Sequence, residues 1–307
     1  MILTLAVLPA LRTDAAVPIN DWGDTLWFLV ELKSLLENGW TWSVPQLSAP
    51  AGLEAVAFPV NTTIDWLLCW ALSFVFHDPG SLLNHFWLLS IGITAWSCNY
   101  ALRCFGVSVI ASGALSLCYS LLPWVYTRNT AHINLVYMWV PLLALGALYL
   151  GMGAPPRLHR AYCRAALPAC VLQGFSYIYF SVFAIFFLAI GAVLGATRQN
   201  WRSTLTAAVA AVSLLIGCVL ANLAPSLYVW HRDGPPPNMA YKRASEAEIY
   251  GLKMRRMITP GVDAPLGILR KWAVADRDAA YANDGEGWSS RLGLIGTVGF
   301  LFLLALS

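Results

Sequence analysis

Long apolar stretches are the feature of this 307-residue sequence that most constrains its fold. A helix needs about 20 mostly apolar residues to span a bilayer. Only 11% of the residues are charged, whereas a soluble domain has about 25%. The sequence therefore predicts an all-α protein, a polytopic transmembrane helix bundle of about seven or eight spans. The clearest candidates for spans are Leu82–Ala101, Val107–Trp124, Leu135–Met152, Ala165–Ala196, Thr204–Ala224 and Leu292–Ser307.

Two of the apolar stretches have lengths that do not fit a single span. Ala165–Ala196 is too long, and Gln173–Tyr177 interrupts its middle with polar residues. This favours two helices joined by a tight turn near Ser176, although one long tilted helix is the alternative. Ile64–His77 is too short, at about 14 residues, and is expected to lie at the membrane surface or to re-enter without crossing.

The basic residues of the short loops predict the orientation in the membrane. If Ile64–His77 does not cross, six arginines fall on one face, which the positive-inside rule makes cytoplasmic. All sixteen acidic residues lie in 12–82 or 225–290, the two long segments that this topology places outside. We therefore expect a multi-pass protein of the inner (plasma) membrane with its long loops on the periplasmic or extracellular side. The six arginines are Arg103, Arg157, Arg160, Arg164, Arg198 and Arg202.

Three parts are expected along the chain. Residues 1–224 form a transmembrane domain whose first outer loop is 12–82, residues 225–290 form a second outer region, and residues 291–307 begin a further transmembrane helix. The apolar Met1–Leu11 is too short to span, and the last helix reaches Ser307 without a polar exit. Both ends are therefore expected to be truncated, as in a fragment of a longer protein.

The first outer loop contains two candidate surface helices. Leu26–Leu36 is amphipathic and is expected to stop at Asn38-Gly39. A loop rich in tryptophan, proline and glycine follows, and the Ile64–His77 helix comes after it. Two such helices and a Trp-rich loop on a bilayer can cover a lipid-facing groove.

Asp24 is the first candidate for chemistry, and Asp21 is the second. Both follow the first apolar segment and are expected close to the lipid headgroups. A carboxylate there can accept a proton from a hydroxyl nucleophile or hold a divalent cation against a phosphate. The competing interpretation is that Asp24 caps the N-terminus of the amphipathic helix.

Further candidates lie in the other outer segments. Arg128, with His132 close by, is placed to bind a lipid-linked phosphate, or to anchor the chain at the interface. Tyr177 and Tyr179, at the break in the long apolar stretch, are expected either in a substrate groove or in an aromatic interface belt. Glu248 lies in a polar helix, Ser245–Met257, that can meet a polar substrate or simply face solvent. Metal-ligand spacings and nucleotide-binding motifs are absent from the sequence.

Several of these segments together resemble a known class. Gly23-Asp24, the Ala49–Gly52 run with Phe58-Pro59, Arg128 with His132, and Ala247–Lys253 are similar to bacterial multi-span proteins grouped with the GT-C integral-membrane glycosyltransferases. The resemblance implies transfer of a sugar from a polyprenyl-phosphate donor to a glycan, lipid or protein acceptor at the outer face. It gives Asp24 the role of base or metal ligand, with Asp21 second.

One departure from the class bears on the mechanism. Many GT-C members have an acidic residue in the second outer loop, where this sequence has Arg128-Asn129-Thr130. We therefore expect an inverting, metal-independent transfer in which Arg128 binds the lipid phosphate, and a divalent cation remains the alternative. The expected partners are the polyprenyl-phosphate-linked sugar and membrane lipid. The even balance of 19 basic and 16 acidic residues does not favour nucleic acid.

Two non-enzymatic functions compete with this one. A lipid-linked-sugar flippase or transporter would place ionisable residues inside its spans, near the midplane. The expected spans are almost free of charge, which favours chemistry at the interface. A structural membrane subunit is the other alternative.

Overall fold

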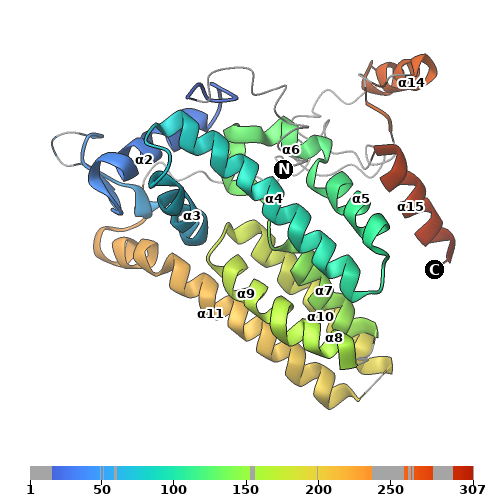
Figure 1. The fold of residues 1–307 in the computed structure, drawn as a ribbon. Coiled ribbons are helices and arrows are strands. Elements are labelled where there is room, and N and C mark those ends of the chain that lie inside the picture. The colour runs from blue at the N-terminus through green and yellow to red at the C-terminus, as the bar shows by residue number, and fades with distance from the viewer. Residues whose placement is uncertain are drawn as a thin grey trace. The chain divides into compact units, whose positions relative to one another are not determined.

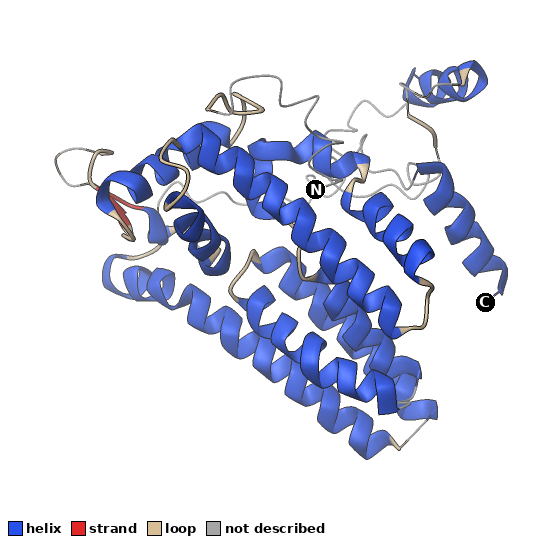
Figure 2. Ribbon diagram, in the orientation of Figure 1, coloured by secondary structure: helices blue, strands red, loops and turns tan. Residues whose placement is uncertain are grey.

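The computed structural model describes residues 16–48, 50, 52–58, 61–152, 156–198, 200–236, 259–261, 264, 266–278 and 293–306. It divides into two compact units, Met1–Leu121 with Arg128–Pro237, and Leu122–Thr127 with Asn238–Ser307. Both are helical (Figures 1 and 2). Met1–Leu11, the helix expected at Ser245–Met257 and Glu248 within it lie outside the described residues.

The first unit contains most of the described helices and one small ribbon of two strands, which is red in Figure 2. The strands pair antiparallel, with Ser43 opposite Glu54. The elements are α2 (Thr25–Asn38), β1 (Ser43–Val44), β2 (Leu53–Glu54), η2 (Ala55–Ala57), α3 (Thr63–Ser73), α4 (Pro79–Cys104), α5 (Val109–Ser120), η3 (Asn129–Leu135), α7 (Val140–Met152), α8 (Pro156–Ala161), η4 (Tyr162–Ala166), α9 (Leu167–Gly174), α10 (Ile178–Arg198) and α11 (Trp201–Asp233).

The second unit contains α14 (Gly267–Asp278) and the apolar α15 (Gly293–Leu306). The short helix α6 (Pro123–Arg128) belongs to it except for Arg128. The apolar stretch at the end of the sequence is therefore helical, as expected.

Four helical stretches in the described residues are long and apolar enough to cross a membrane: Val109–Tyr126, Thr130–Met152, Ile178–Arg198 and Trp201–Asp233. The outward side chains of α10 and α11 are large and apolar, as Phe183, Phe187 and Leu220 show with more than half of their surface exposed. Apolar side chains on an outer helix face suit contact with lipid. A membrane-embedded helical fold is thus supported, while further spans and the side that each loop faces stay predictions.

Small residues bring the core helices of the bundle close together. Gly191 and Gly195 of α10 lie against the backbone of α7, at the carbonyl groups of Ala147 and Leu150, where a Cβ atom would clash. This four-residue spacing of glycines is the small-residue contact that membrane helices use for close approach. Side chains larger than hydrogen at these two positions would push α10 away from α7.

The long stretch Ala165–Ala196 forms two helices, as the polar interruption predicted. One helical run, α8–η4–α9, ends at Gly174, and α10 begins at Ile178. Side-chain bonds close the turn between them: Gln173 Nε2 donates to the carbonyl oxygen of Tyr177 over 3.1 Å, and Ser181 Oγ donates to that of Gln173 over 3.1 Å. The alternative of one continuous helix is therefore wrong.

The short apolar segment after residue 63 is the helix α3, which has 11 residues. At 1.5 Å per residue it is about 16 Å long, too short to cross a bilayer. The amphipathic helix expected at 26–36 is also present as α2, and it ends before Gly39, whose φ is +72°. Both expected helices of the first outer loop therefore form.

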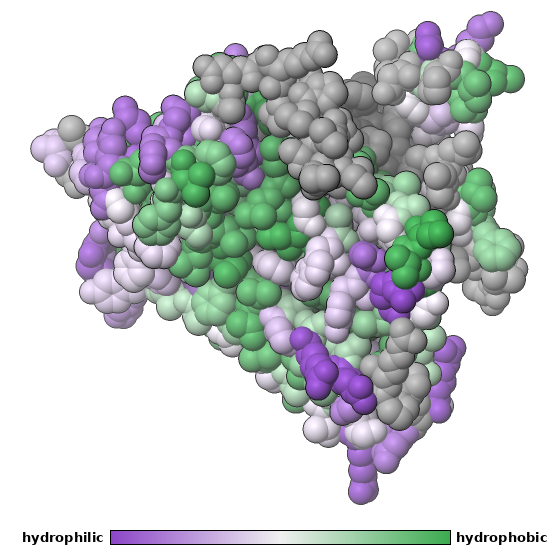
Figure 3. All heavy atoms as spheres, viewed as in Figure 1, coloured by the Kyte–Doolittle hydropathy of each residue, from purple (hydrophilic) through white to green (hydrophobic). Residues whose placement is uncertain are grey.

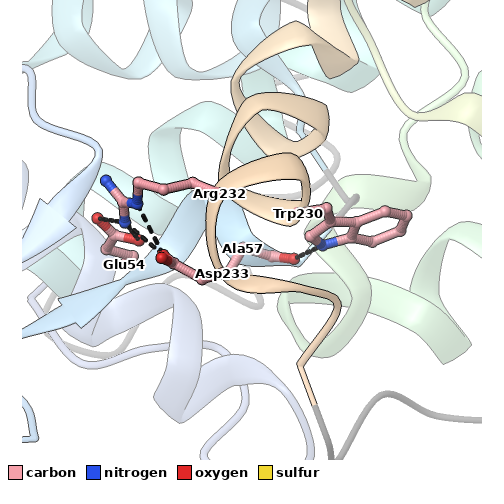
Figure 4. Close-up of polar contacts among 5 residues, drawn as sticks. All are labelled: Glu54, Ala57, Trp230, Arg232 and Asp233. Carbon is pink, nitrogen blue, oxygen red and sulfur yellow. Dashed lines mark hydrogen bonds and ion pairs between the residues drawn. The ribbon is translucent and has the colours of Figure 1, made fainter.

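The C-terminal end of α11 fastens to the first outer loop (Figure 4). Arg232 bonds Glu54 of β2 through an N–O distance of 3.0 Å and also pairs with Asp233. Trp230 Nε1 donates to the carbonyl oxygen of Ala57 over 2.7 Å. In Figure 1, this end of α11 lies beside α2 and α3, and the connection between α10 and α11 lies at the far end of the bundle.

On the face in Figure 3, hydrophobic residues form a band between two hydrophilic regions of the first unit. One of these regions lies over α2 and the strands, and the other lies near the α10–α11 connection. Polar ends separated by an apolar band fit helices that pass through a hydrocarbon layer.

Candidate functional site

A polar anchor on α4 places the start of α2. The amide of Ile19 donates to Asn84 Oδ1 over 3.0 Å, and Asn84 Nδ2 donates to the carbonyl oxygen of Val17 over 2.8 Å. Gly23 then turns the chain with φ +64°, at a point where a Cβ atom would meet Ala131 of η3 at 3.5 Å. These contacts bring Asp24 to the mouth of a cavity.

The cavity, here called the outer cavity, has a volume of about 550 Å³. Its walls come from α2, the ribbon with η2, α3, η3, the turn before α10, and α11 near Pro225. Asp24, Trp40 and Trp42 are exposed, so the outer cavity is open to the surface. Its described polar and aromatic lining residues are Asp24, Trp27, Phe28, Glu31, Ser34, Trp40, Thr41, Trp42, Asn61, Thr62, Thr63, Trp66, Asn134, Phe175, Tyr177 and Asn222.

Asp24 lines this cavity and does not cap α2. It occupies the N-cap position, but its side chain accepts no capping hydrogen bond. The capping interpretation is therefore wrong, and the physical reason is the backbone of Asp24, which is helical (φ −75°, ψ −3°) where a capping residue is normally extended. Its carboxylate is therefore available to interact with a molecule in the cavity.

Glu31 is the second carboxyl group of the outer cavity. It follows Asp24 by seven residues, which is about 10.5 Å along the same face of α2. Burial raises the pKa of Glu31 to about 7, and a hydrogen bond from Trp27 opposes that rise. A carboxyl with a pKa near neutrality can exchange a proton under physiological conditions.

Aromatic side chains form much of the remaining wall. Among the described residues, Trp27 and Trp66 are half-buried lining residues, whereas Trp40 and Trp42 are exposed at the edge. Tyr177 lies across from them, in the turn between α9 and α10. Indole faces are flat, apolar and electron-rich, so they pack well against sugar rings and against cations.

Asp24 and Tyr177 are close enough to affect each other electrostatically. The pKa of Tyr177 is raised first by burial, then by the neighbouring Tyr179, and further by the charge of Asp24. The structure therefore brings together two of the residues that the sequence singled out.

A network of hydrogen bonds, here called the polar junction, forms the inner boundary of the outer cavity. Asn222 Nδ2 donates to the carbonyl oxygen of Asn61 over 2.8 Å, and its Oδ1 accepts from Thr63 Oγ1 over 2.6 Å. Asn61 Nδ2 donates in turn to the carbonyl oxygen of Asn222 and to Ser226 Oγ. The bonds join the start of α3 to α11 beside Pro225, a residue that cannot donate to the helix itself.

Asp65 lies in the same junction and is buried, with 4% of its surface exposed. Its Oδ1 accepts from Ser176 Oγ over 3.3 Å, and its Oδ2 has no hydrogen-bond partner among the residues that the structure describes. Burial raises the pKa of Asp65 to about 8, which the bond from Ser176 opposes, so the group is mainly neutral at pH 7. A small cavity of about 20 Å³ adjoins it and shares Thr62, Trp66 and Asn134 with the outer cavity.

The other candidates from the sequence are not among the residues that line the outer cavity. Asp21 is exposed, and Tyr179 is 49% exposed with its ring 4.7 Å from that of Tyr177. Arg128 and His132 are half-buried at and after the end of α6, whereas Asn134, two residues beyond His132, does line the cavity. Their roles stay predictions.

Sequence reasoning missed Glu31, Asp65 and the wall tryptophans as site residues. Glu31 looked like part of a solvated helix face, but its spacing of seven from Asp24 was a signal that both share that face. Asp65 looked like an interfacial residue, and nothing in the sequence shows that Ser176, 111 positions later, meets it. The Trp-rich loop was recognised as a cover, and the structure makes it a wall of the cavity.

Comparison with known proteins gives no further guide, because no family model, no curated protein and no solved structure matches the chain. Within the described residues, no group of three or more histidine, cysteine, aspartate and glutamate side chains could hold a metal ion.

Proposed function

We propose that the protein is a membrane glycosyltransferase that moves a sugar from a polyprenyl-phosphate donor to an acceptor in the outer cavity. The observation that carries the proposal is the composition of that cavity. Carboxyl groups, amide side chains and tryptophans line one space of about 550 Å³, large enough for a sugar ring and an acceptor group. Flat aromatic walls with polar hydrogen-bonding groups between them suit saccharides, whose rings have apolar faces and polar edges.

Asp24 is the base in this proposal. The acceptor hydroxyl gives its proton to the Asp24 carboxylate as its oxygen attacks the anomeric carbon. The bond from that carbon to the phosphate oxygen breaks, and the electron pair leaves with the polyprenyl phosphate. Attack opposite the leaving group inverts the configuration at the anomeric carbon. The six-residue range 129–134 that follows Arg128 reaches the cavity at Asn134, so Arg128 stays the candidate for the lipid phosphate.

The positions of the ionisable groups favour a glycosyltransferase over a transporter. Asp24 and Glu31 lie on α2, and Asp65 lies on α3, a helix too short to span. All three belong to the first outer loop. A transporter would be expected to place such groups within its spans.

The test is sugar transfer by the full-length protein in membrane vesicles supplied with polyprenyl-phosphate sugars. Asp24→Asn should lower the rate at least about 100-fold, because a general base contributes about 100- to 10,000-fold. The matched control is Asp21→Asn, which removes an exposed carboxylate three residues away and should leave the rate within about threefold. Equal rates for wild type and Asp24→Asn would refute the role of Asp24.

A further inference from the structure

The outer cavity has a one-sided charge. Among its described lining residues, Asp24 and Glu31 carry acidic side chains, and no lysine, arginine or histidine is present. An anionic sugar would meet repulsion here, whereas a positively charged group would be attracted. The polar part of the wall therefore distinguishes ligands by charge.

The tryptophan side chains of the wall also favour a positively charged ligand. Trp27 lies between the two carboxyl groups along α2, and Trp40, Trp42 and Trp66 line the same space. The face of an indole ring attracts an ammonium group through its quadrupole, more strongly than a tyrosine or phenylalanine ring does. Carboxylates and indoles around one space form the kind of surroundings that recognise organic cations.

Glu31 also lacks the solvation that an isolated carboxylate needs. It is half-buried, and its bond from Trp27 offsets only part of the cost of burial. A cation bound beside Glu31 would stabilise the ionised form, and ionised Glu31 would bind the cation in return.

Among the described residues that line the cavity, no lysine, arginine or histidine could pair with Glu31 in place of a bound cation. From α3, Cys69 lies near enough to Glu31 for the two to interact electrostatically, and its thiol carries no positive charge. The other elements packed against α2 are α4 and η3. These carry His85, Arg103 and His132, none of which lines the outer cavity.

We propose that the outer cavity binds an organic ammonium group beside Glu31, with tryptophan side chains around it and the charge of Asp24 adding to the attraction. This assignment rests on the proposed function: if the cavity binds a sugar for transfer, the ammonium group belongs to an amino sugar with a free amine. The same chemistry occurs in the choline headgroup of lipids, so the experiment includes a probe for each source.

The experiment measures ligand binding to the full chain in detergent at pH 7 by tryptophan fluorescence and calorimetry. The probes are glucosamine, glucose, glucuronic acid and tetramethylammonium. Glucosamine should bind at least tenfold more tightly than glucose, and glucuronic acid should bind most weakly. Glu31→Gln should reduce the preference for glucosamine over glucose to less than threefold. The control Glu37→Gln should keep the preference, since Glu37 is an exposed residue of α2 outside the cavity and pairs with Lys33.

The outcomes separate this inference from the proposed function. Equal binding of glucose and glucosamine would overturn the ammonium site and leave a sugar site in place. Binding of tetramethylammonium without binding of either sugar would support the ammonium site, assign it to a headgroup, and overturn the glycosyltransferase. Loss of the preference in both Glu31→Gln and Glu37→Gln would overturn the role of Glu31.

Discussion

The polar junction and the outer cavity share a wall but use their polar groups in opposite ways. In the junction, Asn222 bonds Asn61 and Thr63, so its side chain is occupied by the protein itself. In the cavity, the Asp24 side chain takes no capping bond, and Trp40 and Trp42 present exposed rings. Polar groups that are satisfied internally stabilise the fold, and groups facing an open space can serve a ligand.

The junction should therefore respond to mutation by losing stability. Asn222→Ala leaves the half-buried Thr63 and the backbone carbonyl of the half-buried Asn61 without these bonds. Each such loss costs about 1–3 kcal/mol, so we expect the free energy of unfolding to fall by roughly 3 kcal/mol. Chemical unfolding in detergent micelles measures it. A loss below about 0.5 kcal/mol would show that the junction does not hold α3 to α11.

Asp65 should make the stability of the junction depend on pH. Because folding raises its pKa from 3.8 to about 8, the stability due to its protonated form is fully present below pH 3.8. That stability is lost as the pH rises through about 8. Asp65→Asn cannot ionise, so its stability relative to wild type should increase by at least about 1.4 kcal/mol between pH 5 and pH 9.

Unfolding curves of both proteins across this pH range measure the difference. The exposed Asp21→Asn variant is the control for removal of a carboxylate and should show no comparable increase. A constant difference between Asp65→Asn and wild type would mean that Asp65 is ionised within the fold.

A substitution at the edge of the cavity should have the smallest effect on the free energy of unfolding. Trp42 is 57% exposed, and its contact with the ribbon is a backbone bond, from the Ala55 amide to its carbonyl oxygen, which an alanine retains. Trp42→Ala should change the free energy of unfolding by less than about 0.5 kcal/mol. The same variant should weaken the binding of glucosamine at least about threefold, because one indole face is removed. A large loss of stability would place Trp42 in the fold and not in the site.

Much of the helical architecture could be predicted from the sequence. The apolar stretches predicted the positions of α4, α5, α7, α10 and α11, although α11 continues nine residues beyond the expected Ala224, because a helix in hydrocarbon must satisfy its own backbone and be apolar on the outside. Length excluded α3 from spanning, and Gln173–Tyr177 located the turn before α10. The small ribbon of β1 and β2 was not predicted, since its strands have only two residues each.

The site was predicted less completely than the helices. Asp24 was singled out because it follows an apolar segment, and Tyr177 because it interrupts one, and both line the outer cavity. Glu31 and Asp65 were missed, because a carboxyl on a helix gives no sequence signal for what will pack against it. The burial that raises their pKa values depends on tertiary packing, which places Asp65 against Ser176, 111 positions later in the chain.

The sequence by itself determined that this protein is a helical bundle with apolar outer faces and that its acidic residues lie in two long segments. These properties depend on the period and polarity of neighbouring residues, which are local. Only the tertiary structure decided that Asp24 and Glu31 share a tryptophan-lined cavity while Asp65 is enclosed behind it. That difference depends on which distant segments meet each carboxyl group, such as the turn before α10 at Asp65, and the exclusion of water sets the charge that each one carries.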